Sequence, residues 1–184
     1  METEVITAYV GLGSNLGDRA GNLLLAVRGL MEASFVVNKL SAVYETEPFD
    51  LENPKEHPTY LNMVAEIRVT NISPSQMMAR MLRIEYLLGR RHKNLKKPRT
   101  VDIDLLLYGN FQCYTEFLTL PHPRLHERKF VLVPLAELAP HLIHPVQNRS
   151  VQELLQTVED STSVTRWNPN QRKMENEERK IIFP

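Results

Sequence analysis

Alternation of apolar and acidic residues near the middle of the chain constrains the fold more than any other feature. Apolar residues occupy the odd positions from Val101 to Leu107, and Asp102 and Asp104 stand at even positions between them. Successive side chains of a β-strand point to opposite faces, so the pattern predicts a strand with one apolar face and two carboxylates on the other. Aspartate is depleted in strands, and two neighbouring carboxylates repel each other unless a cation neutralises them. The pair indicates a strand that either meets solvent or faces a cation.

A basic segment leads directly into this strand. Six of the ten residues from Arg90 to Arg99 are Lys or Arg and none is acidic, although the whole chain has a formal net charge of +0. Carboxylates that hold Mg²⁺, beside cations that bind phosphate oxygens, are the groups that a metal–polyphosphate site needs. Two alternatives stay open. The carboxylates can simply line the wet face of a strand, and the basic segment can be a solvated loop or an RNA-binding one.

The remaining chain reads as a series of short elements. Strands are predicted over 5–12, 35–47 (with a bulge or bend) and 60–69, and helices follow the N-caps Asp18 and Ser73, with Gln76 completing a capping box and Gly89 ending the second helix. A weak extended stretch at 111–120, a partial helix at 127–138 and a short helix at 151–158 come later. This order predicts an α+β, ferredoxin-like (βαββαβ) fold, with an antiparallel sheet, helices packed on one face and ligand loops on the other.

Length and composition fit one globular domain. The chain has 184 residues, of which 42% are hydrophobic and 24% charged. We expect a single domain over 1–158, followed by a mobile, charged tail over 159–184. No apolar run approaches the ~18 residues of a membrane helix, and the acidic N-terminus is unlike a secretory signal. A neutral remainder and an aromatic content of 7% favour a small polyphosphate over nucleic acid. We therefore expect a cytoplasmic protein with neither membrane nor nucleic-acid partners.

Other polar and aromatic residues are weaker candidates for a site. His122 lies between two prolines and begins a second basic group that could meet the first in space. Tyr60 and Asn62 share one face of a predicted strand, where an amide could bind the edge of a heterocycle and an aromatic ring could stack on its plane. Core packing is the alternative for Tyr60 and Phe130. The glycines after the first strand do not match the Gly-x-Gly-x-x-Gly spacing of a dinucleotide site and predict a tight turn instead.

Taken together, these motifs resemble the 6-hydroxymethyl-7,8-dihydropterin pyrophosphokinases of folate biosynthesis. The resemblance covers about residues 5–157. It is carried by the order and spacing of GSNLGD at 13–18, YETEP at 44–48, YLN at 60–62, RIE at 83–85 with GR at 89–90, PRTVDID at 98–104, PHPR at 121–124, and R at 128 with FVL at 130–132.

The resemblance implies transfer of a pyrophosphoryl group from ATP, the co-substrate, to the pterin hydroxymethyl group, with release of AMP. It assigns two Mg²⁺ ions to Asp102 and Asp104, and catalytic roles to these aspartates together with Arg90 and Arg99. The implied ATP-binding residues are Glu85, Arg90, Arg99, His122 and Arg128. The implied pterin-binding residues are Thr46, Pro48, Phe49, Tyr60, Asn62 and Phe130. Loops at 49–59 and 91–97 would close over the substrates, and a monomer is expected, with a dimer as the alternative.

Overall fold

The sheet is antiparallel and is built around its two longest strands. The computed structural model describes residues 5–48, 58–90 and 98–170. Its strands are β1 (Val5–Ser14), β2 (Val36–Leu40), β3 (Tyr44–Thr46), β4 (Tyr60–Thr70), β5 (Asp102–Tyr108) and β8 (Val164–Arg166). They form a six-stranded sheet in the order β5-β1-β4-β3-β8, in which β2 also pairs with β4. A small hairpin, β6 (Cys113–Tyr114) and β7 (Thr119–Leu120), lies beside it.

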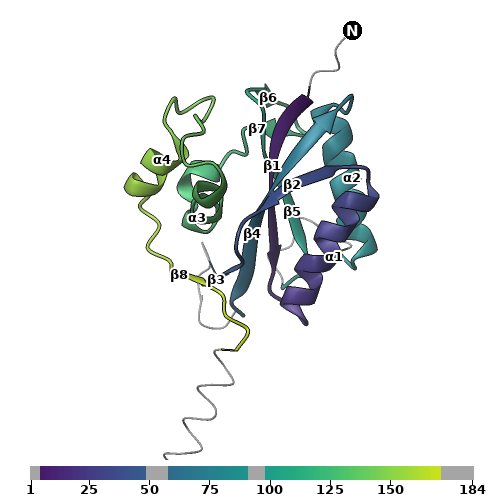
Figure 1. Ribbon diagram of the computed structural model, residues 1–184, viewed down its shortest axis with the longest axis vertical. Coiled ribbons are helices and arrows are strands. Elements are labelled where there is room, and N and C mark those ends of the chain that lie inside the picture. The colour runs from purple at the N-terminus through teal and green to yellow at the C-terminus, as the bar shows by residue number, and fades with distance from the viewer. Residues whose placement is uncertain (1–4, 49–57, 91–97, 171–184) are drawn as a thin grey trace, which may run out of the picture.

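Two helices cover one face of the sheet and enclose the larger core. Both α1 (Arg19–Glu32) and α2 (Pro74–Leu87) lie on this face, to the right of the sheet in Figure 1. Their apolar residues, such as Leu30 and Met81, are fully buried against inward-facing residues of the strands, among them Ile67 and Ile103. The strand order and these two helices confirm the predicted α+β, ferredoxin-like fold.

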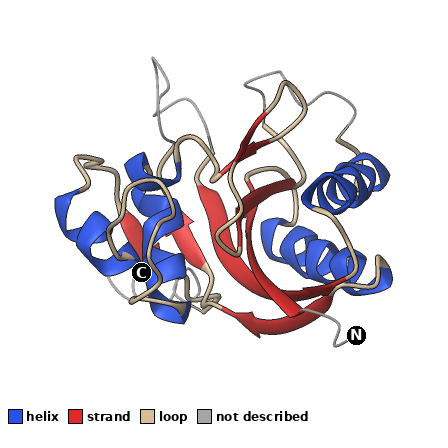
Figure 2. Cartoon of the chain, turned by 90° about the horizontal axis from the view of Figure 1, so that it is seen from above, coloured by secondary structure: helices blue, strands red, loops and turns tan. Residues whose placement is uncertain are grey.

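The opposite face carries helices as well, which corrects one detail of the prediction. The short 3-10 helix η2 (Leu125–Glu127) precedes α3 (Lys129–Leu138), which packs on this face, and α4 (Val151–Thr157) packs against α3. Figure 1 shows α3 and α4 on the side of the sheet opposite to α1 and α2, and Figure 2 shows helices on both sides of the sheet. Leu106 of β5 and Val64 of β4 are buried there against Leu132 and Leu135 of α3. Leu106 follows the two aspartates on the same face of β5, and α3 shields it from solvent. Ligand loops are left with only part of this face.

The predicted helix ends are confirmed, and one of them, at Gly89, directly precedes the basic segment. Asp18 caps α1 by accepting a hydrogen bond from the Gly21 N–H at 3.0 Å. Ser73 and Gln76 form the predicted capping box of α2. Gly89 follows α2 with a φ of 95°, a left-handed conformation that glycine adopts without strain. This turn sets the direction in which Arg90 leaves the helix.

The predicted strand over 35–47 is two strands, β2 and β3. Their pairing with β4 is interrupted at Ser41, whose Oγ accepts a hydrogen bond from the Val64 N–H at 2.9 Å. The expected bulge appears as a register shift between Val37 and Lys39.

The C-terminal boundary at 158 is too early for this structure. Residues Val164–Arg166 form β8, which pairs with β3, and the Trp167 N–H donates to the Val43 carbonyl at 2.9 Å. The later part of the predicted tail, 171–184, lies outside the described residues. Among the helices that the structure describes, none has the length and apolar character of a membrane span.

Candidate active site

Gly13, at the end of β1, lies between the two parts of the candidate site. Its cross-strand neighbours are Asn62 on β4 and Asp102 on β5. A Cβ atom at Gly13 would stand 2.7 Å from Asn62 Oδ1 and 3.8 Å from Asp102 Cβ. Both side chains therefore lie on the sheet face that glycine leaves open, the same face that carries α3. The amide of Asn62 and the carboxylate of Asp102, from two different sequence motifs, thus lie on one face of the sheet.

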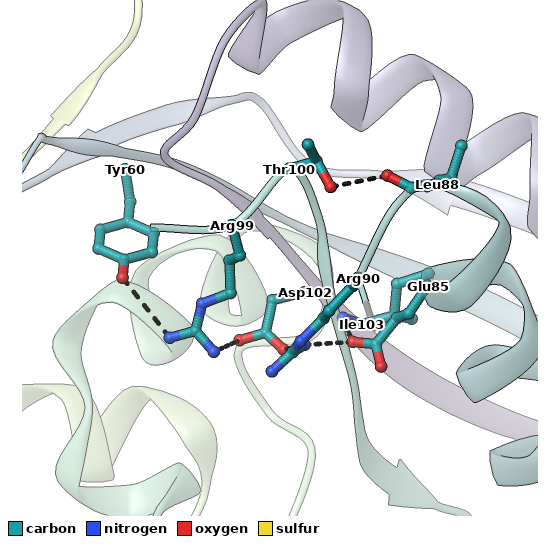
Figure 3. Close-up of polar contacts among 8 residues, drawn as sticks. All are labelled: Tyr60, Glu85, Leu88, Arg90, Arg99, Thr100, Asp102 and Ile103. Atoms are coloured by element: carbon teal, nitrogen blue, oxygen red, sulfur yellow. Dashed lines mark hydrogen bonds and ion pairs between the residues drawn. The ribbon is translucent and has the colours of Figure 1, made fainter. Parts of the chain in front are cut away.

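Asp102 is held by two arginines from either end of the basic segment. Arg90 pairs with Asp102 Oδ1, and Arg99 Nη1 lies 3.1 Å from Asp102 Oδ2. Figure 3 shows the carboxylate between the two guanidinium groups. The Arg90 side chain is almost buried, at 5% exposure, whereas Asp102 and Arg99 are 21% and 24% exposed. Two cations thus neutralise the first carboxylate of the pair, while it still reaches solvent.

Glu85 anchors this group from α2. Its side chain is 3% exposed and pairs with Arg90, and its Oε1 accepts a hydrogen bond from the Ile103 N–H at 2.8 Å. A buried carboxylate requires such compensation, because removing it from water is costly. Glu85 therefore holds both Arg90 and the backbone between the two aspartates.

Asp104, the second carboxylate, faces the second basic group. The His122 N–H donates to the Leu106 carbonyl at 2.9 Å, which brings the Pro-His-Pro turn alongside β5. Burial lowers the pKa of His122, and the Asp104 carboxylate opposes this change. Burial also lowers the pKa of Arg128, where Arg124 adds to the effect and Asp104 again opposes it. The predicted meeting of the two basic groups therefore occurs around Asp104.

Two buried guanidinium nitrogens point to an anionic ligand. Within the described residues, Arg99 Nε and Arg128 Nε are buried and have no hydrogen-bond partner. For Arg99, burial lowers the pKa, but Asp102, Tyr60 and Asp104 outweigh it and the pKa is raised. Buried donors in folded proteins are nearly always satisfied, and charged donors bind phosphate oxygens strongly. These nitrogens are suited to the oxygens of a polyphosphate.

The other side of Gly13 offers groups suited to a flat heterocycle. Asn62 is 8% exposed and its Nδ2 donates to Thr46 Oγ1 at 2.7 Å. The Tyr60 hydroxyl accepts from Arg99 Nη2 at 3.5 Å, and the Arg99 guanidinium lies 5.9 Å from the centre of the Tyr60 ring. Pro48, at the end of the described part of this loop, is buried. Thr46, Tyr60 and Asn62 are thus brought together as predicted.

The remaining predicted pterin residues are less closely defined. Phe130 is on α3, which contacts β3 and β4, and the Arg128 guanidinium lies 5.5 Å from the centre of its ring. Phe49 lies outside the described residues, as do most of the first predicted lid and all of the second, at 91–97.

Asn15 is a site residue to which the sequence analysis gave no role. Its Oδ1 accepts from the Arg99 N–H at 2.8 Å, and its own N–H donates to the Arg99 carbonyl at 3.2 Å. Asn15 therefore binds both the N–H and the carbonyl of the Arg99 backbone, and it is only 2% exposed. A polar residue directly after a buried strand, inside the motif at 13–18, was the signal that could have identified it.

The donor chemistry of the aspartate pair fits Mg²⁺. In the part of the chain that the structure describes, no three His, Cys, Asp or Glu side chains gather into a metal-binding group. Mg²⁺ is commonly held by one or two carboxylates, with its other ligands coming from substrate phosphates and water. Two neighbouring aspartates beside a set of arginines provide that arrangement, whereas a permanent structural metal would need more protein ligands.

Comparison with known proteins decides the family. Residues 9–140 match the model of the 7,8-dihydro-6-hydroxymethylpterin-pyrophosphokinase (HPPK) family. The chain belongs to the HPPK family. A 2-amino-4-hydroxy-6-hydroxymethyldihydropteridine pyrophosphokinase of Aquifex aeolicus (strain VF5) is 36% identical over 147 residues, which cover 80% of this chain and 89% of the relative. A relative of the same name from Bacillus subtilis (strain 168) is 43% identical over 132 residues, or 71% of this chain and 77% of the relative. The predicted family is confirmed.

Solved structures with the same fold are more distant in sequence. Wild-type HPPK-DHPS of Plasmodium falciparum, solved with pteroate, matches this HPPK chain with a TM-score of 0.67 at 17% identity. The match covers 85% of this chain and 43% of that chain, so this chain spans less than half the length of the solved protein. At this identity the likeness supports the fold alone.

Proposed function

We propose that this chain transfers the pyrophosphoryl group of ATP to the hydroxymethyl group of 6-hydroxymethyl-7,8-dihydropterin, for folate synthesis. In this reaction the hydroxyl oxygen bonds to the β-phosphorus of ATP, and the bond from that phosphorus to the α–β bridging oxygen breaks. The electron pair leaves with AMP and the hydroxyl proton passes to solvent. The observation that carries the proposal is the position of Gly13 between two groups. Asn62, on one side, has an amide suited to a heterocycle, and Asp102, on the other, has a carboxylate suited to Mg²⁺.

Residues on the Asn62 side would bind and orient the pterin. The Asn62 side chain offers a carbonyl and an amide for the polar edge of the ring, and Thr46 fixes the amide through its hydrogen bond. Tyr60 and Phe130 would stack on the ring, with Pro48 and Phe49 completing the contacts. Holding the hydroxymethyl group close to the β-phosphorus accounts for much of the rate enhancement expected of such an enzyme.

Residues on the Asp102 side would bind the triphosphate. Arg90, Arg99 and Arg128 lie around the two aspartates and would neutralise the charge of the triphosphate, because attack at the β-phosphorus moves charge onto the departing α-phosphate while the β- and γ-phosphates keep theirs. His122, whose pKa is lowered by burial, would donate a hydrogen bond to a phosphate oxygen. Glu85 would fix Arg90. Asp102 and Asp104 would hold Mg²⁺, with two ions expected. When bound, Mg²⁺ supplies further charge neutralisation and makes the pterin hydroxyl more acidic.

Product analysis tests this proposal. The purified chain is incubated with ATP, Mg²⁺ and 6-hydroxymethyl-7,8-dihydropterin, and the nucleotide product is identified by chromatography. We expect AMP and the pterin diphosphate in equal amounts, and neither in the presence of excess EDTA. ADP in place of AMP would indicate transfer of a single phosphoryl group and contradict the proposal. Salt-sensitive RNA binding without AMP formation would favour the polyanion-binding alternative.

Two further expectations stay predictions. A monomer is expected, and sedimentation of the purified chain tests it. A cytoplasmic location is likewise expected.

A further inference from the structure

Arg19, the first residue of α1, contacts both β3 and the residue that directly precedes β4, the two strands that carry candidate pterin residues. Its Nη1 donates to the Thr59 carbonyl at 2.9 Å and to Thr59 Oγ1 at 2.7 Å, and its Nη2 lies 2.8 Å from Glu45 Oε1. Thr59 Oγ1 in turn donates to Glu45 Oε1 at 2.9 Å. The three side chains form a closed network, called the Arg19 network below.

This network lies behind the pterin face. Thr46 and Tyr60 are a cross-strand pair, and Glu45 and Thr59 immediately precede them in the sequence. Because successive side chains of a strand point to opposite faces, Glu45 and Thr59 project toward the α1 side while Thr46 and Tyr60 project toward the site. Arg19 therefore reaches the strand pair from the face opposite to that of Thr46 and Tyr60.

The network joins two chain segments that are 14 residues apart in the sequence. Glu45 belongs to β3, Thr59 directly precedes β4, and the residues between them include the segment 49–57. The strand β3 has three residues, so few ladder hydrogen bonds fix its position against β4. A bidentate guanidinium that binds both segments fixes their separation more tightly than this short ladder alone.

The position of Arg19 in its helix argues for a specific role. The N-terminus of a helix carries partial positive charge, so a cation in the first turn is electrostatically unfavourable, and α1 has no acidic residue in that turn. The Arg19 side chain is nonetheless 15% exposed and pairs with Glu45, which is 31% exposed. Its charge is directed away from solvent and toward the strand pair.

We propose that Arg19 is a positioning residue for pterin binding. This proposal rests on the proposed function and adds to it a residue that orients the pterin-binding groups. The Arg19 network fixes Glu45 relative to Thr59, and hence Thr46 relative to Tyr60 and Asn62, so that the Thr46–Asn62 hydrogen bond holds the amide in the orientation that the pterin edge requires. Arg90 and Asp102, which are assigned to the triphosphate, pair with each other outside this network. Arg99 contacts Tyr60 but is also held by Asp102 and by Asn15. We therefore expect nucleotide binding to depend little on the Arg19 network.

The test compares Arg19→Met with Arg28→Met. Arg28 is on the same helix and also pairs with a glutamate, Glu32, but both side chains are exposed and neither belongs to the Arg19 network. Dissociation constants are measured by calorimetry for the dihydropterin, with Mg²⁺ and α,β-methylene-ATP present, and separately for α,β-methylene-ATP. We expect Arg19→Met to weaken dihydropterin binding by at least about tenfold. Nucleotide binding should stay within about twofold, as should both affinities of Arg28→Met.

Further variants keep the test decisive. Arg19→Lys retains the charge but not the planar fork, so it should recover only part of the lost affinity. If Arg19→Met does not fold, Thr59→Val removes the hydroxyl from the network with little change of shape and should weaken dihydropterin binding in the same direction. Equal dihydropterin affinity in Arg19→Met and Arg28→Met, proportional loss of both substrates, or no effect of Thr59→Val would overturn the proposal. Wild-type chain that makes no AMP would overturn the proposed function itself.

Discussion

The Glu85 carboxylate accepts a hydrogen bond from the Ile103 N–H at 2.8 Å, at the residue between the two aspartates of β5. The same carboxylate pairs with Arg90, whose other anion is Asp102. One buried side chain of α2 therefore connects the backbone of the candidate metal strand to a candidate phosphate-binding arginine. The positions of the Ile103 backbone and of Arg90 both depend on the Glu85 carboxylate, whose side chain is only 3% exposed to solvent.

Glu85→Ala should destabilise the fold strongly. The substitution leaves the Ile103 N–H without its acceptor and removes one of the two carboxylates that Arg90 contacts, which should lower the free energy of unfolding by about 3–5 kcal/mol. Glu85→Gln keeps an acceptor for the N–H and should cost less, about 1–2 kcal/mol. Urea unfolding at constant m-value measures both. A loss below about 0.5 kcal/mol for the alanine variant would mean that the buried pair has no structural role.

Gly13→Ala should weaken dihydropterin binding with a modest loss of stability. The added Cβ would stand 2.7 Å from Asn62 Oδ1, so the amide must move and its hydrogen bond to Thr46 must change. Gly11→Ala is the matched control on the same strand and face, because its Cβ would meet Leu106 at an ordinary 3.5 Å.

Binding and unfolding measurements on the two glycine variants separate the effects. We expect the dihydropterin dissociation constant of Gly13→Ala to rise about tenfold or more. The overpacking should lower the free energy of unfolding by about 1–3 kcal/mol. If Gly13→Ala and Gly11→Ala bind the dihydropterin equally well, the open position at Gly13 has no part in the site.

Much of the fold follows from local patterns. Asp18, and Ser73 with Gln76, cap the helices as predicted because capping depends on residues within one turn. The alternation around Asp102 and Asp104 gives β5 its two faces because a strand exposes every second side chain. These features need no knowledge of the rest of the chain.

Other features depend on contacts that local patterns do not encode. The strand β8 is polar and largely exposed, and it is held at the sheet edge by backbone pairing with β3 rather than by an apolar face. The helix α3 covers the second sheet face because Leu106 and Val64 are apolar there, yet its own pattern does not say which face it covers. Asn15 acts through the Arg99 backbone, 84 residues away in sequence.

Lowering the pH should destabilise the protein through His144. This residue is 3% exposed, and its Nδ1 accepts hydrogen bonds from the N–H groups of Val146 and Gln147. Burial, with a smaller effect of His126, lowers the pKa of His144 from 6.5 to about 4. The unfolded chain therefore binds a proton at a higher pH than the folded chain does. The stability contribution is complete above pH 6.5 and is lost as the pH falls toward about 4.

A comparison of two asparagine variants isolates this effect. In His144→Asn, the amide oxygen can still accept the two backbone hydrogen bonds, but the side chain does not titrate. His141→Asn changes an exposed histidine three residues away. Thermal unfolding between pH 4 and 7 should show a shallower pH dependence for His144→Asn than for wild type or His141→Asn. Identical slopes in all three proteins would contradict the assigned cause.

The most direct test of the account is the turnover of Asp102→Ala and Asp104→Ala. The central claim is that these two carboxylates hold Mg²⁺ against the triphosphate while the surrounding cations neutralise it. Initial rates of AMP formation from ATP and 6-hydroxymethyl-7,8-dihydropterin, at saturating Mg²⁺, are compared with wild type, and circular dichroism checks that each variant is folded. We predict that each folded variant loses several powers of ten in turnover, as expected when a metal ligand is removed. Near-normal turnover in either variant would contradict the metal assignment.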